Sequence, residues 1–165
     1  MSANPSFPAQ PDTQNPGSVE HALQVLNNIF QLAQGQALAE KSKNLDQCYF
    51  RLEEILDHLL KHYQVNVTSE RDADGQHTYH DDLITAFNTN QSLPGPLRAS
   101  LGGALSQNIL LDLKKFRNGY KNFGQGRISA AELQTLVNTA VNGLTTILPK
   151  VEQACQQAKI MSEPL

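Results

Sequence analysis

The hydrophobic positions of this chain recur at the three- and four-residue intervals of an amphipathic helix, and no stretch has the alternation of a half-buried strand. The clearest case is the range 45–63, where one apolar stripe continues without interruption. Its members are Leu45, Cys48, Tyr49, Leu52, Ile55, Leu56, Leu59, Leu60 and Tyr63. The pattern predicts a long helix with this stripe in the core.

The chain before this helix changes composition at Ser18. Residues 1–17 hold four prolines among small polar residues, and this composition predicts a disordered tail. Ser18 is a typical N-cap for a first helix over 19–33. Gly35 either ends that helix or lies within a longer one that continues through 37–39.

The chain after the second helix becomes polar. The ranges 65–79 and 88–92 predict loops, and the apolar positions between them predict a short helix over 81–87. Pro96 suits the first turn of a third long helix, because a residue there needs no backbone donor. The apolar spacing predicts that this helix extends over 97–121.

Two local signals bear on the last two long helices. Gly102 and Gly103 each cost the third helix about 1 kcal/mol against alanine, which is tolerable if another helix packs closely there. The range 129–132 (SAAE) is a capping box that predicts the start of the last helix, whose apolar face continues to about Lys159. Pro149 lies inside it and predicts a kink or a break.

Four long amphipathic helices, a short helix and no strand pattern predict an all-α fold, an antiparallel helical bundle. The length of 165 residues suits one domain, over 18–160, with a flexible C-terminus at 161–165. The absence of a secretion signal, together with only two cysteines, predicts buried thiols and a cytoplasmic location. No apolar run approaches the roughly 18 residues that span a bilayer, so no membrane contact is predicted.

The range 109–123 (ILLDLKKFRNGYKNF) is the one stretch whose charge hints at chemistry. The formal net charge of the chain is −3, yet basic residues gather here beside an aromatic edge. They are Lys114, Lys115, Arg117 and Lys121 within the range and Arg127 just beyond it, and the adjoining aromatic residue is Tyr120. One interpretation is a solvated helix face, and the other is a local contact with phosphate or nucleic acid.

From 81 to 151 the order of features resembles the HEPN superfamily. HEPN domains have a short helix, a Leu-Pro turn, a helix ending in Arg-Asn, three residues, a histidine, a loop and a long closing helix. The matching stretches here are LITAF, SLPGP, LRASLGGALSQNILLDLKKF, RNGYKN, FGQG and ISAAELQTLVNTAVNGLTTILPKV. The similarity is sharpest at 116–122 and implies an HEPN-like bundle.

In that superfamily the arginine holds the phosphate and the histidine moves a proton during metal-independent RNA cleavage. The resemblance implies that Arg117 is the phosphate clamp, that Asn118 is an orienting amide and that Asn122 occupies the position of the histidine. An amide does not titrate near neutral pH, so Asn122 is not a general acid or base. The implied function is RNA or nucleotide binding in a bacterial toxin–antitoxin or defence setting, with a degenerate or weak ribonuclease site.

The resemblance further implies a homodimer with its cleft across the interface, and a cognate antitoxin as a partner. His58 or His62 would replace the missing proton carrier if the fold brings it near Arg117. Glu54, His58 and His62 recur at four-residue intervals, and histidines one helical turn apart can bind the same metal ion. A solvated helix face is the favoured interpretation, so we predict no metal and no cofactor. The alternative function is a helical module that binds a protein partner and performs no chemistry.

Overall fold

The computed structural model describes residues 17–67 and 79–165. Over these ranges the chain forms six α-helices and no β-strand, which confirms the all-α prediction. The helices are α1 (Val19–Gln34), α2 (Leu38–His62), α3 (Tyr79–Thr89), α4 (Gly95–Leu97), α5 (Leu110–Gly124) and α6 (Ala130–Ala158). Two π-helical stretches, η1 (Arg98–Gly102) and η2 (Leu105–Ile109), lie between α4 and α5.

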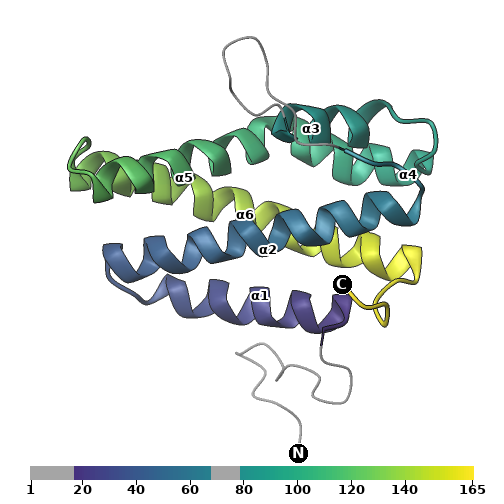
Figure 1. Ribbon diagram of the computed structural model, residues 1–165, viewed down its shortest axis with the longest axis horizontal. Coiled ribbons are helices and arrows are strands. Elements are labelled where there is room, and N and C mark those ends of the chain that lie inside the picture. The colour runs from purple at the N-terminus through teal and green to yellow at the C-terminus, as the bar shows by residue number, and fades with distance from the viewer. Residues whose placement is uncertain (1–16, 68–78) are drawn as a thin grey trace, which may run out of the picture.

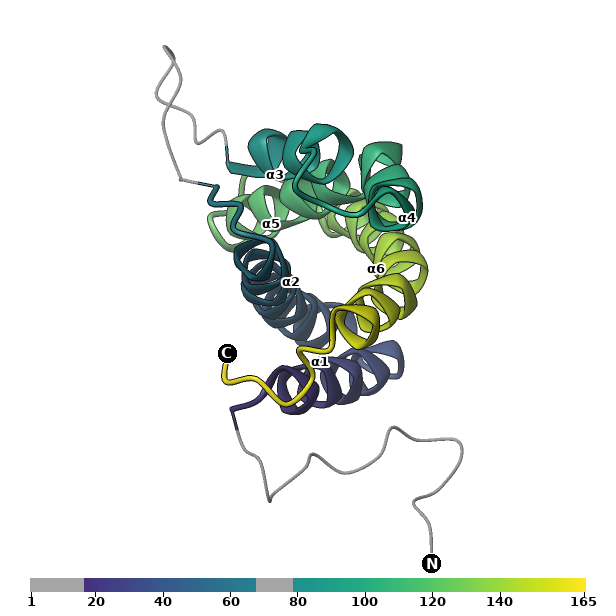
Figure 2. The ribbon, with the colours of Figure 1, turned by 90° about the vertical axis from the view of Figure 1, so that its right-hand side faces the viewer.

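Successive long helices run in opposite directions, as in an antiparallel bundle. Figure 1 shows α1 beside α2 and α5 beside α6, and the closest packing is within these two pairs. The view along the bundle in Figure 2 shows α1, α2, α5 and α6 around a common centre, with α3 and α4 at one side. The core lies between these helices and includes the whole predicted stripe of α2 up to Leu60.

The first helix begins and ends where local chemistry favours it. The Ser18 hydroxyl accepts a hydrogen bond from the His21 amide at 3.0 Å, as predicted for the N-cap. Gly35 ends α1, and residues 38–39 belong to α2 instead. The second helix therefore starts at Leu38, earlier than its apolar stripe predicted, and its polar first turns include Ser42, whose side chain is buried.

The predicted third helix is divided in the structure, between Gly95 and Gly124, into α4, the two π-helical stretches and α5. The expected close approach occurs at Gly102, where a Cβ would lie 2.5 Å from the Phe87 carbonyl oxygen of α3. Gly103 has open space at the same position. Asn108, within η2, takes a positive φ of 70°. The sequence pattern predicted the helix but not its π-helical turns.

The last helix begins at the predicted capping box, with Ser129 and Glu132 bonded reciprocally. Of the kink or break predicted at Pro149, the break does not occur, because α6 continues through this residue to Ala158. Pro149 is exposed, while Val151, Ala154 and Cys155 beyond it are buried and hold the last turns against the core. Tertiary packing therefore outweighs the missing backbone hydrogen bond.

Loop boundaries differ slightly from the sequence pattern. Within the predicted loop 65–79, residues 68–78 lie outside the described residues, and Tyr79 is already in α3. The helix α3 continues to Thr89, since the Asn88 and Thr89 side chains donate to carbonyl oxygens one turn earlier. The predicted tail, up to residue 16, also lies outside the described residues.

Residues 161–165, predicted to be flexible, pack as a strap across the start of α1. The Val19 amide donates to the Glu163 carbonyl at 2.9 Å, and the Glu20 amide donates to the Met161 carbonyl at 2.8 Å. These carbonyls satisfy amides that a helix leaves unpaired in its first turn. We call residues 161–165 the C-terminal strap. Its Leu165 amide also donates to the Gly17 carbonyl at 2.8 Å.

Candidate functional site

Helix geometry divides the basic patch of α5 between two surfaces. The Arg117 side chain extends to α2, where it meets two carboxylates. Lys115 lines a groove against α6 instead, and Lys121 and Arg127 are exposed near the turn that follows α5. Within the described ranges, Lys114, Lys115, Lys121 and Arg127 form no ion pair. Among the described residues of the patch, Arg117 is therefore the one cation that forms ion pairs.

Arg117 is held by charge and by aromatic rings. Its Nε lies 3.1 Å from Asp46 Oδ1, and its Nη1 lies 3.7 Å from Glu53 Oε1. Asp46 and Glu53 are seven residues apart on α2, so both face α5. The guanidinium carbon lies 5.1 Å from the centroid of the Tyr49 ring and 5.9 Å from that of Phe50, within cation–π range. The cluster ties α2 to α5.

The same guanidinium opens onto a surface cavity of about 440 Å³, which we call the Arg117 pocket. Its lining residues are Asp46, Gln47, Phe50, Arg51, Glu54 and Arg117. Phe50 is 54% exposed although it is a large apolar residue, and the Arg117 side chain is 41% exposed. The pocket thus offers a planar apolar surface directly beside a fixed cation.

The cluster around Arg117 contains two carboxyl groups, those of Asp46 and Glu53, beside one guanidinium. Burial raises the pKa of Glu53 to about 7, the Arg117 charge opposes the rise, and the Asp46 carboxylate adds to it. The carboxyl group of Glu53 therefore keeps its proton up to about neutral pH.

The groove between α5 and α6 is a separate cavity of about 470 Å³. It is lined by Lys115, Asn118, Gly119, Asn122, Ile128, Glu132, Thr135 and Leu136. A side chain at Gly119 would collide with the Leu136 side chain, so the glycine allows the two helices to approach. The Asn118 and Asn122 side chains make no hydrogen bond to the described part of the chain.

Within the part of the chain that the structure describes, the three residues implied by the HEPN resemblance line two different cavities. Arg117 lines the Arg117 pocket, whereas Asn118 and Asn122 line the α5–α6 groove. Tyr120, the aromatic residue of the predicted patch, is half-buried and stacks on Phe116 with ring centroids 6.2 Å apart. Its ring is thus used in internal packing.

The histidines considered as substitute proton carriers lie elsewhere. His58 Nε2 is 3.1 Å from Glu163 Oε1 of the C-terminal strap, and the His62 ring meets the Tyr63 ring edge to face. Among the described residues, no three potential metal ligands form a group. The other possible metal ligands close to these histidines in sequence are Asp72, Asp74, His77 and His80. The first three lie outside the described residues, as does the side chain of His80.

Sequence reasoning missed Asp46, Phe50 and Glu53. Asp46, Tyr49 and Glu53 recur at i, i+3 and i+7, so they share the edge of the α2 stripe. Phe50 breaks the stripe, since it is a large apolar residue on the polar side of the helix. These two signals were available, but nothing in the sequence indicated which basic residue they face.

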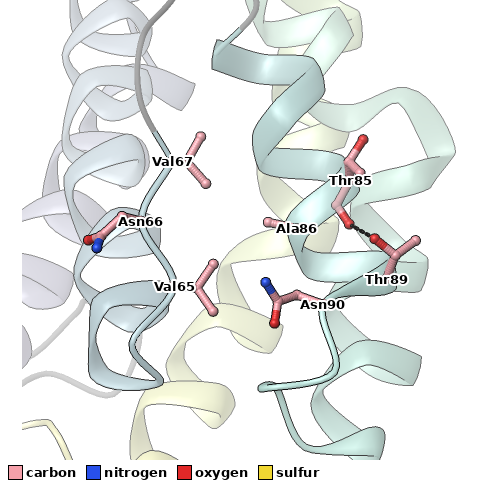
Figure 3. A pocket seen from close by; sticks show the side chains of 7 residues that line it. All are labelled: Val65, Asn66, Val67, Thr85, Ala86, Thr89 and Asn90. Carbon is pink, nitrogen blue, oxygen red and sulfur yellow. Dashed lines mark hydrogen bonds between the residues drawn. The ribbon is translucent and has the colours of Figure 1, made fainter.

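A further cavity of about 290 Å³ lies between α3 and the segment that follows α2 (Figure 3). Val65, Val67 and Ala86 face it from its two sides, and Asn66, Thr85, Thr89 and Asn90 complete its lining. None of these side chains titrates near neutral pH, and Thr89 Oγ1 is bonded to the Thr85 carbonyl at 2.8 Å. This cavity offers no acid–base chemistry.

The two cysteines are not available as nucleophiles. Both are buried, as predicted, and burial raises the pKa of each thiol to about 12. The Cys48 thiol lies 3.8 Å from the Leu26 carbonyl oxygen in the core. A thiolate is therefore scarce at neutral pH.

The described helices include none that is both long enough and apolar enough to cross a membrane. Comparisons with family models, with curated proteins and with solved structures give no match to this chain.

Proposed function

We propose that this chain is an HEPN-like helical bundle that binds a nucleotide unit of single-stranded RNA in the Arg117 pocket and does not cleave it efficiently. The observation that carries this proposal is the pairing of the Arg117 guanidinium with the exposed Phe50 ring in one cavity. A base stacks on an aromatic side chain with about 1–3 kcal/mol, whatever its sequence. The guanidinium matches the geometry of the adjoining phosphate.

The charges of the pocket indicate that this binding is weak. Arg51 and Arg117 are balanced by Asp46 and Glu54 in the lining, and Glu53 adds further negative charge beside them. A single phosphate contact also gives a shallow salt dependence, with a slope of about −0.7 in log K against log salt for a single strand. The proposal therefore predicts a weak complex with a small salt effect.

The absence of efficient cleavage follows from the position of Asn122. Its amide lines the α5–α6 groove rather than the Arg117 pocket, and an amide does not carry a proton near neutral pH. General acid–base help is typically worth about 10² to 10⁴ in rate, so a site without it is slow.

The test measures binding of a short fluorescent single-stranded RNA by anisotropy. Arg117→Ala and Phe50→Ala should each weaken binding about tenfold. Arg117→Lys should bind more tightly than Arg117→Ala but less tightly than the unmodified chain, because an ammonium group lacks the planar fork of a guanidinium. Arg127→Ala is the matched control, since it removes an exposed charge of the same patch outside the pocket. Circular dichroism and thermal melts verify that each variant is folded.

Equal loss in Arg127→Ala and Arg117→Ala would mean that the RNA contacts a diffuse basic surface. A chain that binds no RNA under any of these conditions would favour a module that binds a protein partner instead.

A homodimer is the second candidate, favoured by the division of Arg117 and Asn122 between two cavities. A cleft that contains both residues requires a second copy of the chain. Asn122→His should then raise ribonuclease activity, and adding Arg117→Ala should abolish the gain. Sedimentation of the same samples reports the oligomeric state. A dimer whose Asn122→His variant gains no activity would exclude a shared cleft.

A further inference from the structure

One face of the Arg117 pocket contains Phe50, Arg51 and Glu54, which all come from α2. Residues three or four apart on a helix are neighbours, with about 5–6 Å between their Cβ atoms. Arg51 and Glu54 are three apart, and Phe50 and Glu54 are four apart. A base stacked on the exposed Phe50 ring would therefore have a guanidinium and a carboxylate beside its edge.

Arg51 and Glu54 form no ion pair within the described part of the chain. They are one turn apart, but an acidic residue that follows a basic one along a helix is in the less favourable order for pairing. Arg51 Nε has no hydrogen-bond partner among the described residues. Burial raises the pKa of the nearby Cys48 thiol to about 12 and the Arg51 charge opposes the rise, so this thiol stays neutral and does not pair with Arg51. The pocket thus contains one donor group and one acceptor group for the edge of a base.

We infer that the Arg117 pocket selects guanine among the four bases of the RNA. This inference rests on the proposed function and adds the base that the pocket recognises. Guanine presents two donors, N1–H and the N2 amino group, and beside them two acceptors, O6 and N7. A carboxylate accepts two parallel hydrogen bonds, and a guanidinium donates two. Glu54 therefore pairs with N1 and N2, and Arg51 pairs with O6 and N7.

The other three bases match these two groups less well. Adenine and cytosine each offer one amino donor beside a ring nitrogen that accepts, so they pair with only one oxygen of the carboxylate. Uracil offers a single ring N–H between two carbonyl oxygens. A bidentate pair discriminates against the wrong base by about five- to 150-fold. Because Glu54 is exposed, we expect the lower end of that range, about five- to tenfold.

Arg117 has a role that does not depend on the base. Its Nε lies 3.1 Å from Asp46 Oδ1, and it comes from α5 rather than from the face that contains Arg51 and Glu54. Contact with a phosphate is the same for every nucleotide. Loss of Arg117 should therefore weaken the binding of all strands alike, whereas loss of Glu54 should change their order.

The test measures anisotropy of short fluorescent uridine strands whose central base is uracil, guanine, adenine, cytosine or hypoxanthine, with the full chain. The unmodified protein should bind the guanine strand about five- to tenfold more tightly than the uracil strand. Hypoxanthine lacks the N2 amino group and should lose most of this preference. Glu54→Gln should bring the guanine strand to the level of the others, because an amide has only one acceptor atom. Glu40→Gln, the matched control, removes an exposed carboxylate of α2 outside the pocket and should keep the preference.

Equal affinity for all five strands in the unmodified chain would overturn guanine selection and leave the proposed function standing. A guanine preference that persists in Glu54→Gln would also overturn it. Absence of binding to every strand would overturn the proposed function and this inference together. A strand with 7-deazaguanine, which lacks the N7 acceptor, gives a second reading on the unmodified chain that needs no variant to fold. It should bind more weakly than the guanine strand, and equal binding of the two would exclude the contact from Arg51.

Discussion

Gly102 and Gly103 are neighbours in sequence but face different surroundings. At Gly102 an added Cβ would lie 2.5 Å from the Phe87 carbonyl oxygen, a backbone atom that cannot turn aside. At Gly103 the same atom would meet nothing within 4 Å. One glycine is therefore required by packing and the other only weakens the helix.

Alanine substitutions at these two positions should have opposite effects. Gly102→Ala should lower the free energy of unfolding by about 1–3 kcal/mol, because α3 must move away. Gly103→Ala should raise it by about 0.5–1 kcal/mol through better helix propensity. Urea melts of the two variants measure both effects. If both changes destabilise equally, α3 does not constrain this part of the chain.

Substitution of Leu56 tests the packing of the core, also at the scale of a single residue. Its side chain is fully buried on the predicted stripe of α2. Leu56→Ala should cost about 2–5 kcal/mol, through lost apolar contact and the cavity left behind. Leu32→Ala removes the same atoms from a side chain that is 54% exposed and should change stability far less. Comparable losses in the two variants would contradict the burial of α2.

At the scale of elements, regular patterns were predictable and irregular ones were not. The stripe over 45–63 and the capping box at Ser129 are local properties of sequence, and both predictions were confirmed. The early start of α2, the π-helical turns and the unbroken helix at Pro149 depend on contacts with other helices. Local propensity does not contain that information.

The C-terminal strap supports α1, so removal of the strap tests how far the stability of α1 depends on it. Truncation after Ile160 removes the carbonyls that accept from the Val19 and Glu20 amides. We expect a loss of about 1–4 kcal/mol, since each hydrogen bond contributes about 0.5–1.5 kcal/mol. Thermal and urea melts measure the loss.

Deletion of residues 1–16 is the control at the other end of the chain. These residues contain few apolar side chains, so their removal should shift the melting midpoint by no more than a few degrees. A small effect of both truncations would mean that α1 does not depend on the C-terminal strap.

At the scale of the whole molecule, the site was harder to predict than the fold. The sequence indicated Arg117 through its basic surroundings, but the residues that define its pocket come from α2. Which face of α2 meets α5 depends on how the helices pack. The separation of Asn122 from Arg117 follows from the same packing.

The stability of the whole molecule should depend on the protonation of Glu53. Its pKa is raised from 4.5 to about 7 in the folded state, so the folded chain keeps a proton that the unfolded chain releases. The free energy of unfolding should therefore fall as pH rises from about 4.5 to about 7, by about 1–3 kcal/mol. Glu53→Gln should remove this slope and gain stability relative to the unmodified chain at pH above about 7.

Urea melts of the two proteins at acidic and alkaline pH measure this difference directly. Other titrating groups affect both proteins alike, so the contrast isolates Glu53. Parallel curves for the two proteins would show that Glu53 has an ordinary pKa in the folded chain.

The hydrogen bond between Leu165 and Gly17 brings the two ends of the described chain together at one end of the bundle. A short linker could join them, and the chain could be reopened at the exposed turn around Gly126, between α5 and α6. Such a circular permutant would keep every helix whole while making α6 the first to be synthesised and α5 the last. Gly17 and Leu165 therefore lie at the same side of the bundle, far along α5 from that turn.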